Sequence, residues 1–268
     1  GFTIGFKNGN KRGEAYSVYV VDKLKQLGYD VKGKIVDFSE YGIPQKRQRY
    51  ILVGTKKDNA ENFFDLLVQN KVTFFKSKNF EKDTVSLSDA ISDLLQSHGT
   101  KESPDTKNFR AGIYAKATTS YQKLMRKDKN LTKKVASSHR FANHKKETIE
   151  KFQYILEFGR ANKNISDEIK AKYNIKKRTV VPLCSNSPTP TLTTLPDDYI
   201  HYCEPRILTV REYARIQSFP DSYEFRGGYT TGGNRRKTDV PRYTQIGNAI
   251  PPLFAEQAGL VLKEMINT

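Results

Sequence analysis

The segment Arg206-Ile-Leu-Thr-Val-Arg-Glu-Tyr-Ala-Arg-Ile-Gln-Ser-Phe-Pro220 is the part of the chain around which the rest can be arranged. Thr209 and Glu212 have the spacing of a capping box, in which the hydroxyl accepts the N3 amide and the carboxylate accepts the N–H of the cap residue. A short helix with one buried edge is therefore predicted, and Pro220 ends it. The residues of that edge are Val210, Tyr213, Ala214 and Gln217.

Two arginines, Arg211 and Arg215, stand one turn apart on this helix. Like charges at this spacing repel each other unless an anion or a carboxylate lies between them. Taken alone, the helix favours a solvated face on which Glu212 is the local counter-charge. The alternative is that the pair binds an anion or a carboxylate.

The composition limits the classes of partner. The 268 residues can bury one core, or one core and a smaller lobe. The chain has 46 Lys and Arg against 29 Asp and Glu, a formal net charge of +17, which favours a polyanionic partner. A membrane is not expected as a partner, because no apolar run approaches the ~20 residues that span a bilayer, and nothing at the start resembles a signal peptide.

The cysteines and histidines favour neither disulfides nor a metal site. Two cysteines, Cys184 and Cys203, do not make a disulfide framework, so a reducing cytosolic compartment is expected. The chain has no Cys-x-x-Cys pair and its four histidines are scattered, so no metal site is expected. The first residue is Gly1 instead of an initiating Met, from which we expect a processed, split or truncated product.

The first 55 residues have the pattern of a sheet edge. Residues 14–27 predict a helix with its apolar residues on one side, 31–38 a strand, 39–44 a turn and 50–55 a second, fully buried strand. This order fits the edge of an α/β sheet. The apolar residues of this helix are Val18, Val21, Leu24 and Leu27.

The middle of the chain is less regular. Apolar residues between 63 and 75 predict core, and helices are predicted at 86–95, 145–158 and 166–173. Residues 97–143 interleave basic and aromatic residues, which suits either a nucleic-acid surface or solvated loops. Residues 185–196 are rich in hydroxyl groups and proline, so an irregular loop is expected there.

Three polar side chains alternate at the start of the predicted strand at 50–55: Gln45, Arg47 and Arg49. Alternate residues of an extended chain point the same way, and ligands of open α/β sheets bind at strand ends. The residues themselves allow either an anionic or base-edge ligand or a simple cap of the sheet edge.

The helix at 206–220, together with Gly42-Ile-Pro-Gln-Lys-Arg-Gln-Arg-Tyr50 and Tyr243-Thr-Gln-Ile-Gly-Asn-Ala-Ile-Pro-Pro252, resembles the last three motif blocks of the DNA cytosine-5 methyltransferases, in the family's order. The blocks and their flanks cover about half of the chain. The resemblance implies an α/β fold: a partial S-adenosylmethionine-dependent methyltransferase sheet with a smaller, largely irregular target-recognition domain. Residues 1–80 would hold C-terminal strands of the catalytic domain, 81–220 the recognition domain, and 221–268 the return to the catalytic domain with its final helix.

The resemblance also implies roles for named residues. Arg49 would contact O2 of a flipped cytosine, Arg47 would support the DNA or the catalytic loop, and Gln45 would orient both. A fixed guanidinium at O2 would stabilise the charge that builds on the ring when a thiolate adds to C6. S-adenosylmethionine would lie near Asn248 and Ala249. Contacts with double-stranded DNA are expected from Thr191, Leu192, Thr193, Arg235 and Arg236.

The chain departs from the family in one respect that affects activity. The nucleophilic Cys in a Pro-Cys context and the Glu of Glu-Asn-Val are absent, and neither Cys184 nor Cys203 stands where the nucleophile would. His201, two residues before Cys203, is a weak candidate partner because no third group is evident. We therefore expect the C-terminal part of a methyltransferase that is inactive alone and needs a missing N-terminal portion.

The chain is expected to be part of an enzyme that transfers a methyl group to C5 of cytosine in a specific duplex sequence. The expected setting is a restriction-modification system in the cytoplasm of a bacterium. The alternative is a non-catalytic, sequence-specific DNA-binding subunit of a split methyltransferase. An RNA-directed relative is a weaker choice, because the lysine-rich lobe is longer than a compact RNA-modifying enzyme needs.

Overall fold

The computed structural model of the chain describes residues 2–5, 7–8, 11–57, 59–127, 135–230 and 238–267. Helices and short strands alternate in a mixed α/β fold, which confirms the predicted class at that level. The helices are α1 (Tyr16–Gln26), α2 (Glu61–Gln69), α3 (Lys71–Ser77), α4 (Leu87–Ile91), α5 (Ser120–Met125), α6 (Lys146–Phe158), α7 (Asp167–Lys172), α8 (Val210–Ile216), α9 (Arg242–Asn248) and α10 (Pro252–Asn267). The strands are β1 (Lys7–Asn8), β2 (Lys11–Arg12), β3 (Asp30–Asp37), β4 (Gln48–Thr55), β5 (Thr100–Glu102), β6 (Arg110–Ile113), β7 (Val135–Arg140), β8 (Val181–Pro182) and β9 (Tyr199–Ile200).

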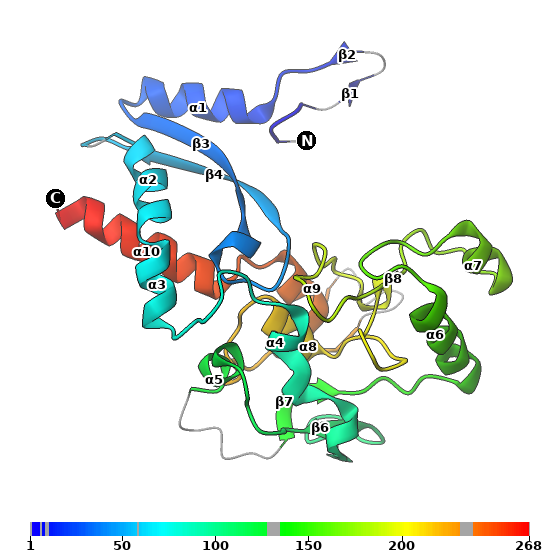
Figure 1. Ribbon diagram of the computed structural model, residues 1–268. Coiled ribbons are helices and arrows are strands. Elements are labelled where there is room, and N and C mark those ends of the chain that lie inside the picture. The colour runs from blue at the N-terminus through cyan, green and yellow to red at the C-terminus, as the bar shows by residue number, and fades with distance from the viewer. Residues whose placement is uncertain are drawn as a thin grey trace.

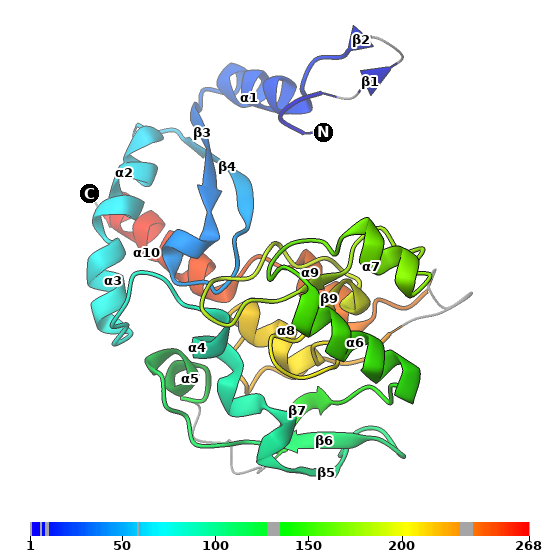
Figure 2. The ribbon, with the colours of Figure 1, turned by 45° about the vertical axis from the view of Figure 1, so that its right-hand side comes forward.

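The last helix, α10, packs beside elements from the first 80 residues of the chain. Figure 1 shows α1, β3, β4, α2 and α3 together, with α10 crossing beside them, while α4 to α9 and β5 to β9 form the rest of the molecule. Figure 2 shows the same division from a second side, with α8 among the elements of the larger group. The arrangement agrees with a chain that leaves one region near residue 80 and comes back to it with its final helix.

The strands β3 and β4 pair antiparallel from Asp30↔Thr55 to Asp37↔Gln48 and form a sheet of two strands within the described residues. The predicted strand at 50–55 exists, but the expectation that it is fully buried is wrong, because its residues are partly or fully exposed. Ile35 on β3 is 66% exposed. Complete burial of a strand needs neighbours on both faces. Among the described residues, α1 and α2 both contact β3, whereas no helix makes a comparable contact with β4.

The first helix also buries less than expected. Val18 and Leu27, predicted to face inward, are 41% and 65% exposed, whereas Val21 and Leu24 are half-buried. A two-stranded sheet is too narrow to cover the whole apolar side of a helix that lies across it. The period of the apolar residues predicted the helix α1 correctly. How far these residues are buried depends on the narrow sheet against which the helix packs.

The main core draws residues from all three predicted segments of the chain, including Phe38, Leu67, Tyr213 and Phe254. A second, smaller core joins α6 and α7 to the strands that follow them; its buried members are Phe152, Ile155, Ile165, Ile169, Val180 and Ile200. One core with a smaller lobe is therefore the arrangement that this length of chain adopts. The predicted helices at 145–158 and 166–173 form, and Ser166 caps the second.

Arginines in the basic and aromatic segment 97–143 are used inside the protein. Arg126 stacks on Tyr114, with its guanidinium carbon 4.3 Å from the ring centre. Arg140 lies 4.0 Å from the ring centre of Phe109 and 3.9 Å from that of Tyr229. Stacking of this kind replaces part of the lost hydration of a guanidinium. These two cations therefore support the fold and are not a free nucleic-acid surface.

The described part of the chain contains no helix that is long and apolar enough to cross a membrane. It also shows no group of three or more His, Cys, Asp or Glu residues that could hold a metal ion.

Candidate functional site

The helix α8 lies at the centre of the site. Its capping box forms as the sequence predicts, because Thr209 Oγ1 accepts the N–H of Glu212 at 3.2 Å and Glu212 Oε2 accepts the N–H of Thr209 at 2.7 Å. All seven of its residues are buried, charged ones included. A helix buried on every side must pair each of its charges with another group of the protein.

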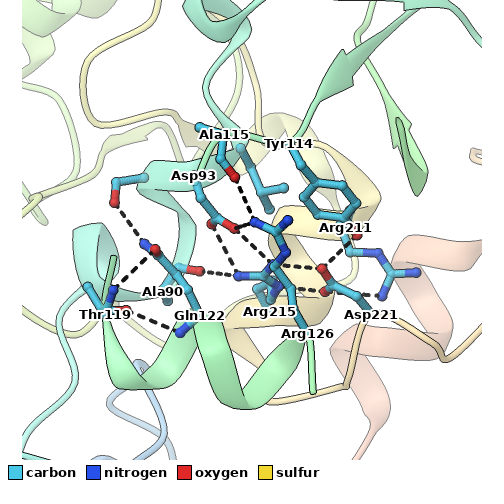
Figure 3. A network of polar contacts seen from close by, with 12 residues as sticks. Ala90, Asp93, Tyr114, Ala115, Thr119, Gln122, Arg126, Arg211, Arg215 and Asp221 are labelled. Carbon is cyan, nitrogen blue, oxygen red and sulfur yellow. Dashed lines mark hydrogen bonds and ion pairs between the residues drawn. The ribbon is translucent and has the colours of Figure 1, made fainter. Parts of the chain in front are cut away.

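The solvated face expected for Arg211 and Arg215 is wrong. Both side chains are 0% exposed, and the carboxylate of Asp221 lies between them (Figure 3). Arg215 binds Asp221 with two bonds of 2.5 and 2.6 Å, and Arg211 Nη1 lies 3.9 Å away from the same carboxylate. A carboxylate between the two arginines was the alternative that their spacing allowed. The residue that supplies this carboxylate, Asp221, follows the end of the helix.

A second carboxylate extends this network. Asp93 lies 3.2 Å from Arg215 and 3.2 Å from Arg126, and the hydroxyl of Tyr114 donates to Asp221 at 2.7 Å. Burial would raise the pKa of Asp221, but the charges of Arg215 and Arg211 and the hydrogen bonds from Arg215 and Tyr114 together lower it. Asp221 is therefore ionised, and the network joins α8 to the segments that carry α4 and α5.

Glu212 has a different partner from the one expected. It forms a double ion pair with Arg206, at 2.7 and 2.8 Å, instead of neutralising Arg211 and Arg215. Burial would raise the pKa of Glu212, but Arg206 lowers it to about 2. His201 Nε2 lies 3.6 Å from the same carboxylate, and burial lowers the pKa of His201 to about 3, so that this histidine is neutral.

The end of α8 holds the other parts of the site in place. Gln217 Nε2 donates to the Ile246 carbonyl of α9 at 3.0 Å, and the hydroxyl of Ser218 accepts the N–H of Leu253 in α10 at 3.1 Å. The Tyr213 hydroxyl donates to the Leu195 carbonyl at 3.3 Å. The helix thus fixes α9, α10 and the loop before residue 196 relative to one another.

Arg47 joins the regions that the sequence analysis singled out. Its guanidinium donates to Gln45 Oε1 at 3.3 Å, to the Leu192 carbonyl at 3.4 Å and to the Gly247 carbonyl at 2.8 Å. Arg47 is only 3% exposed, and Gln45 is 0% exposed. Burial, with a smaller effect from the positive charge of Arg49, lowers the pKa of Arg47 to about 10, so the group remains charged at neutral pH.

Arg49 stands apart from the buried pair. It is exposed, and its one hydrogen bond to a described residue runs from Nη1 to the carbonyl of Gln48 at 2.7 Å. The three alternating residues at the strand end therefore differ in role. Gln45 and Arg47 are buried and position their neighbours, whereas the guanidinium of Arg49 can reach a ligand.

The residues 191–195, which we call the threonine segment, lie against this centre. The N–H of Leu192 donates to Gln45 Oε1 at 3.1 Å, and the Thr191 hydroxyl donates to the Lys46 carbonyl at 2.7 Å. Leu192 is 1% exposed and belongs to the main core, so a contact between its side chain and DNA does not occur in this conformation. Thr191 and Thr193 are exposed.

The predicted cofactor residues end α9. Asn248 is its last residue and is exposed, with no hydrogen bond from its side chain to any residue that the structure describes, and Ala249 follows in an extended conformation. Gly247 is required by packing, since a Cβ there would lie 2.8 Å from the Thr193 carbonyl. Arg235 and Arg236, predicted to contact DNA, lie outside the described residues. Arg242, which belongs to the same loop in sequence, forms an ion pair with Asp105 at 2.6 Å.

The Cys203 thiol does not have the surroundings of an activated nucleophile. Partial burial of the Cys203 thiol, and then the negative charge of Glu204, raise its pKa above the ordinary value. The Sγ of Cys203 lies 3.8 Å from His201 Nδ1, but this nitrogen already accepts the backbone N–H groups of Cys203 and Glu204. Since an active thiol needs a lowered pKa or a free base, His201 and Cys203 do not make a catalytic pair.

The sequence matches the family described as C-5 cytosine-specific DNA methylase over residues 8–264. Among curated relatives, the type II methyltransferase M.DdeI of Desulfomicrobium norvegicum is 30% identical over 88% of this chain and 55% of its own length. The type II methyltransferase M1.HphI of Haemophilus parahaemolyticus is 27% identical over 92% of this chain and 52% of its own length. The chain spans about half the length of these relatives.

A third relative is shorter than this chain. The type II methyltransferase M.AquIB of Picosynechococcus is 34% identical over 131 residues, which are 48% of this chain and 88% of that relative. Among solved structures, an Escherichia coli protein described as a DNA modification methyltransferase encoded within a prophage aligns over 96% of this chain and 67% of its own. The TM-score is 0.63 and the identity 22%, so this likeness concerns the fold.

Proposed function

Because the chain belongs to the C-5 cytosine-specific DNA methylases, we propose that it takes part in methyl transfer from S-adenosylmethionine to C5 of cytosine in a specific sequence of duplex DNA. A bacterial restriction-modification system is the proposed setting, with the DNA of the cytoplasm as substrate, since the most similar relatives are type II methyltransferases. Residues 1–80 and 221–268 would belong to the catalytic domain and residues 81–220 to the target-recognition domain.

The observation that carries this proposal is the position of Arg47. It hydrogen-bonds Leu192 and Gly247, which are 145 and 200 residues away in the chain, and so joins two motif blocks of the family, 42–50 and 243–252, to the threonine segment. A protein that kept these blocks only as remnants would have no need for a buried guanidinium between them.

Arg49 is the proposed contact to the flipped cytosine. A base inside a duplex cannot reach such a group, so the target nucleotide must leave the stack. When a thiolate adds to C6, negative charge develops on the ring, and a guanidinium already held at O2 stabilises it without reorganisation. Arg47 and Gln45 are then positioning residues, which hold the strand that presents Arg49.

Asn248 and Ala249 suit part of a cofactor site. The exposed amide of Asn248 can both donate and accept hydrogen bonds, and the small side chain of Ala249 leaves room beside it. S-adenosylmethionine, when bound, would supply the methyl group. The role of these residues would be to hold its polar groups at the end of α9.

The nucleophile would come from a segment that is not within residues 1–268. The raised pKa of Cys203 and the occupied lone pair of His201 support this proposal. The sheet of β3 and β4 also has an unpaired outer edge on each strand among the described residues, beside exposed apolar side chains of α1. Strand edges and apolar faces of this kind are usually covered by further structure.

A non-catalytic DNA-binding subunit of a split methyltransferase is the second candidate. The net charge of +17 and the short relative M.AquIB support it. In that case the chain alone would bind duplex DNA mainly through phosphates, and its affinity would fall steeply with salt.

Transfer of labelled methyl groups to DNA tests both candidates. We would compare the chain alone, the chain with a separately expressed N-terminal half that carries Pro-Cys and Glu-Asn-Val, and the same pair with Cys184→Ser and Cys203→Ser. The proposal expects transfer only when the second half is present, and no effect of the serine substitutions. Activity of the lone chain that depends on either cysteine would contradict the external nucleophile. Lack of transfer in every mixture that binds DNA would favour the non-catalytic subunit.

A further inference from the structure

A series of polar contacts connects the lobe of α6 and α7 to the threonine segment. Lys177, in the connection after α7, forms ion pairs of 2.6 Å with Asp197 and 2.8 Å with Asp198. The second oxygen of Asp198 accepts a hydrogen bond of 2.6 Å from the Thr193 hydroxyl. Asp198 is only 4% exposed, so its hydrogen bond with Thr193 lies away from water, where charge-assisted hydrogen bonds are strong, whereas Asp197 is exposed.

The threonine hydroxyls are used inside the protein. Thr193 donates its single proton to Asp198 and accepts the N–H of Leu195 at 3.1 Å, while Thr191 donates to the Lys46 carbonyl. A DNA phosphate can only accept hydrogen bonds, so neither hydroxyl can bind one without giving up its present acceptor. In this conformation the two hydroxyls shape the segment, and contacts with DNA fall to other groups.

The same segment controls Arg47. Its Leu192 carbonyl accepts from the Arg47 guanidinium, and its Thr193 carbonyl packs against Gly247. A change in the turn at Thr193 would therefore move two of the groups that hold Arg47. The ion pair between Lys177 and Asp198 can therefore affect the proposed base pocket through the threonine segment.

We propose that Asp198, held by Lys177, is a positioning residue that sets the conformation of the threonine segment and thereby the position of Arg47. The proposal deepens the proposed function, on which its catalytic consequence rests. According to this proposal, the lobe of α6 and α7 supports the site through the ion pair between Lys177 and Asp198.

Hydrogen exchange of the chain alone tests the structural part. Asp198→Asn keeps the shape and removes the charge, and the amides of residues 191–195 should then exchange about tenfold faster, as for loss of one charge-assisted hydrogen bond. Thr193→Val should also speed this exchange, and the double variant should show less than the sum of the two effects in free energy, because both changes act on the hydrogen bond from Thr193 to Asp198. Asp167→Asn, on the exposed side of α7, is the matched control and should exchange like the unmodified chain. No increase in Asp198→Asn, or additive effects in the double variant, would overturn the proposal.

A second variant tests the same contact if Asp198→Asn unfolds the protein. If Asp198→Asn raises exchange throughout the chain, Lys177→Met decides instead, because it keeps the apolar stem and removes only the ammonium group. Faster exchange confined to residues 191–195 supports the proposal, and unchanged exchange in that segment contradicts it.

Kinetics of the complete methyltransferase test the consequence for function. Asp198→Asn should lower kcat about tenfold and leave the KM for S-adenosylmethionine unchanged, because the contact positions Arg47 and, through it, the strand that presents Arg49. An equal rise in the KM values for target DNA and S-adenosylmethionine would indicate a general loss of structure and contradict the positioning role. If the unmodified enzyme transfers no methyl group to cytosine, the proposed function fails, whereas the hydrogen-exchange result stands on its own.

Discussion

At the scale of single residues, the two arginines of one short segment have opposite environments. Arg47 is buried and donates hydrogen bonds to three acceptors, whereas Arg49 is exposed. Their separation by one residue would place them on the same side of a strand, but only the first is enclosed by the threonine segment and α9. A structural and a ligand-facing role can therefore be tested with one pair of variants.

Arg47→Ala should destabilise the protein, and Arg49→Ala should not. Removal of Arg47 leaves buried acceptors unpaired, each at a cost of about 1–3 kcal/mol in the free energy of unfolding, whereas an exposed side chain contributes less than about 0.5 kcal/mol. Urea unfolding of the two variants measures the difference. In the complete enzyme, Arg49→Ala should lower kcat by about a hundredfold with little change in DNA affinity. If Arg49→Ala kept its rate but lost affinity for S-adenosylmethionine, Arg49 would belong to the cofactor site.

The carboxylate between Arg211 and Arg215 should be among the most sensitive positions of the chain. Asp221→Asn leaves two buried guanidinium groups without their main counter-charge, and loss of one partner from a buried ion pair costs about 3–5 kcal/mol. Thermal and urea unfolding measure the loss. Asp167→Asn, whose carboxylate is fully exposed, serves as the control with unchanged stability. Equal stability of the two variants would mean that α8 does not depend on this network.

At the scale of elements, α8 connects segments that are far apart in the chain. It is short, but its hydrogen bonds reach the threonine segment, α9 and α10. The loop 185–196 is irregular, as its hydroxyl and proline content predicted, and yet it is fixed to its neighbours by backbone and side-chain contacts. Order in this loop comes from its surroundings and not from its own propensity.

Replacing residues 185–196 by the equivalent loop of a relative with another target should change the sequence that the complete enzyme methylates. The physical reason is that α8 and Gln45 fix the approach of this loop, while the groups that it exposes would make the base contacts that read a sequence. Methylation-sensitive sequencing of DNA measures the outcome. If the pattern stayed the same while activity was retained, specificity would lie elsewhere, with residues 97–143 as the next candidates.

At the scale of the whole molecule, stability should fall as the solution becomes acidic. Burial lowers the pKa of His139 to about 4 and that of His201 to about 3, both below the value of about 6.5 in an unfolded chain. The unfolded chain therefore binds more protons, so the stability from these residues is present above pH 6.5 and is lost as the pH falls toward the folded pKa. Each histidine contributes a slope of up to about 1.4 kcal/mol per pH unit.

Urea unfolding between pH 7.5 and 4.5 checks this slope, with His201→Gln as the comparison. Glutamine keeps a hydrogen-bond acceptor but cannot be protonated, so the slope should become shallower. Glu212, with a pKa of about 2, adds a further loss of stability only as the pH falls below about 4.5. A stability that stays constant from pH 7 to 5 would contradict neutral, buried histidines.

The sequence by itself determined the local structure and the family. The capping box at Thr209 and Glu212, the helices at 145–158 and 166–173 and the motif blocks follow from neighbouring residues and could be predicted without coordinates, whereas α2, α3 and α5 were not predicted as helices. Only the tertiary structure decided which charges are buried and what pairs with them: Asp221 between two arginines, Arg206 with Glu212, and Arg47 in contact with residues 145 and 200 positions away. The physical reason is that capping and periodicity depend on residues within one or two turns, whereas burial and ion pairing depend on which distant segments pack together.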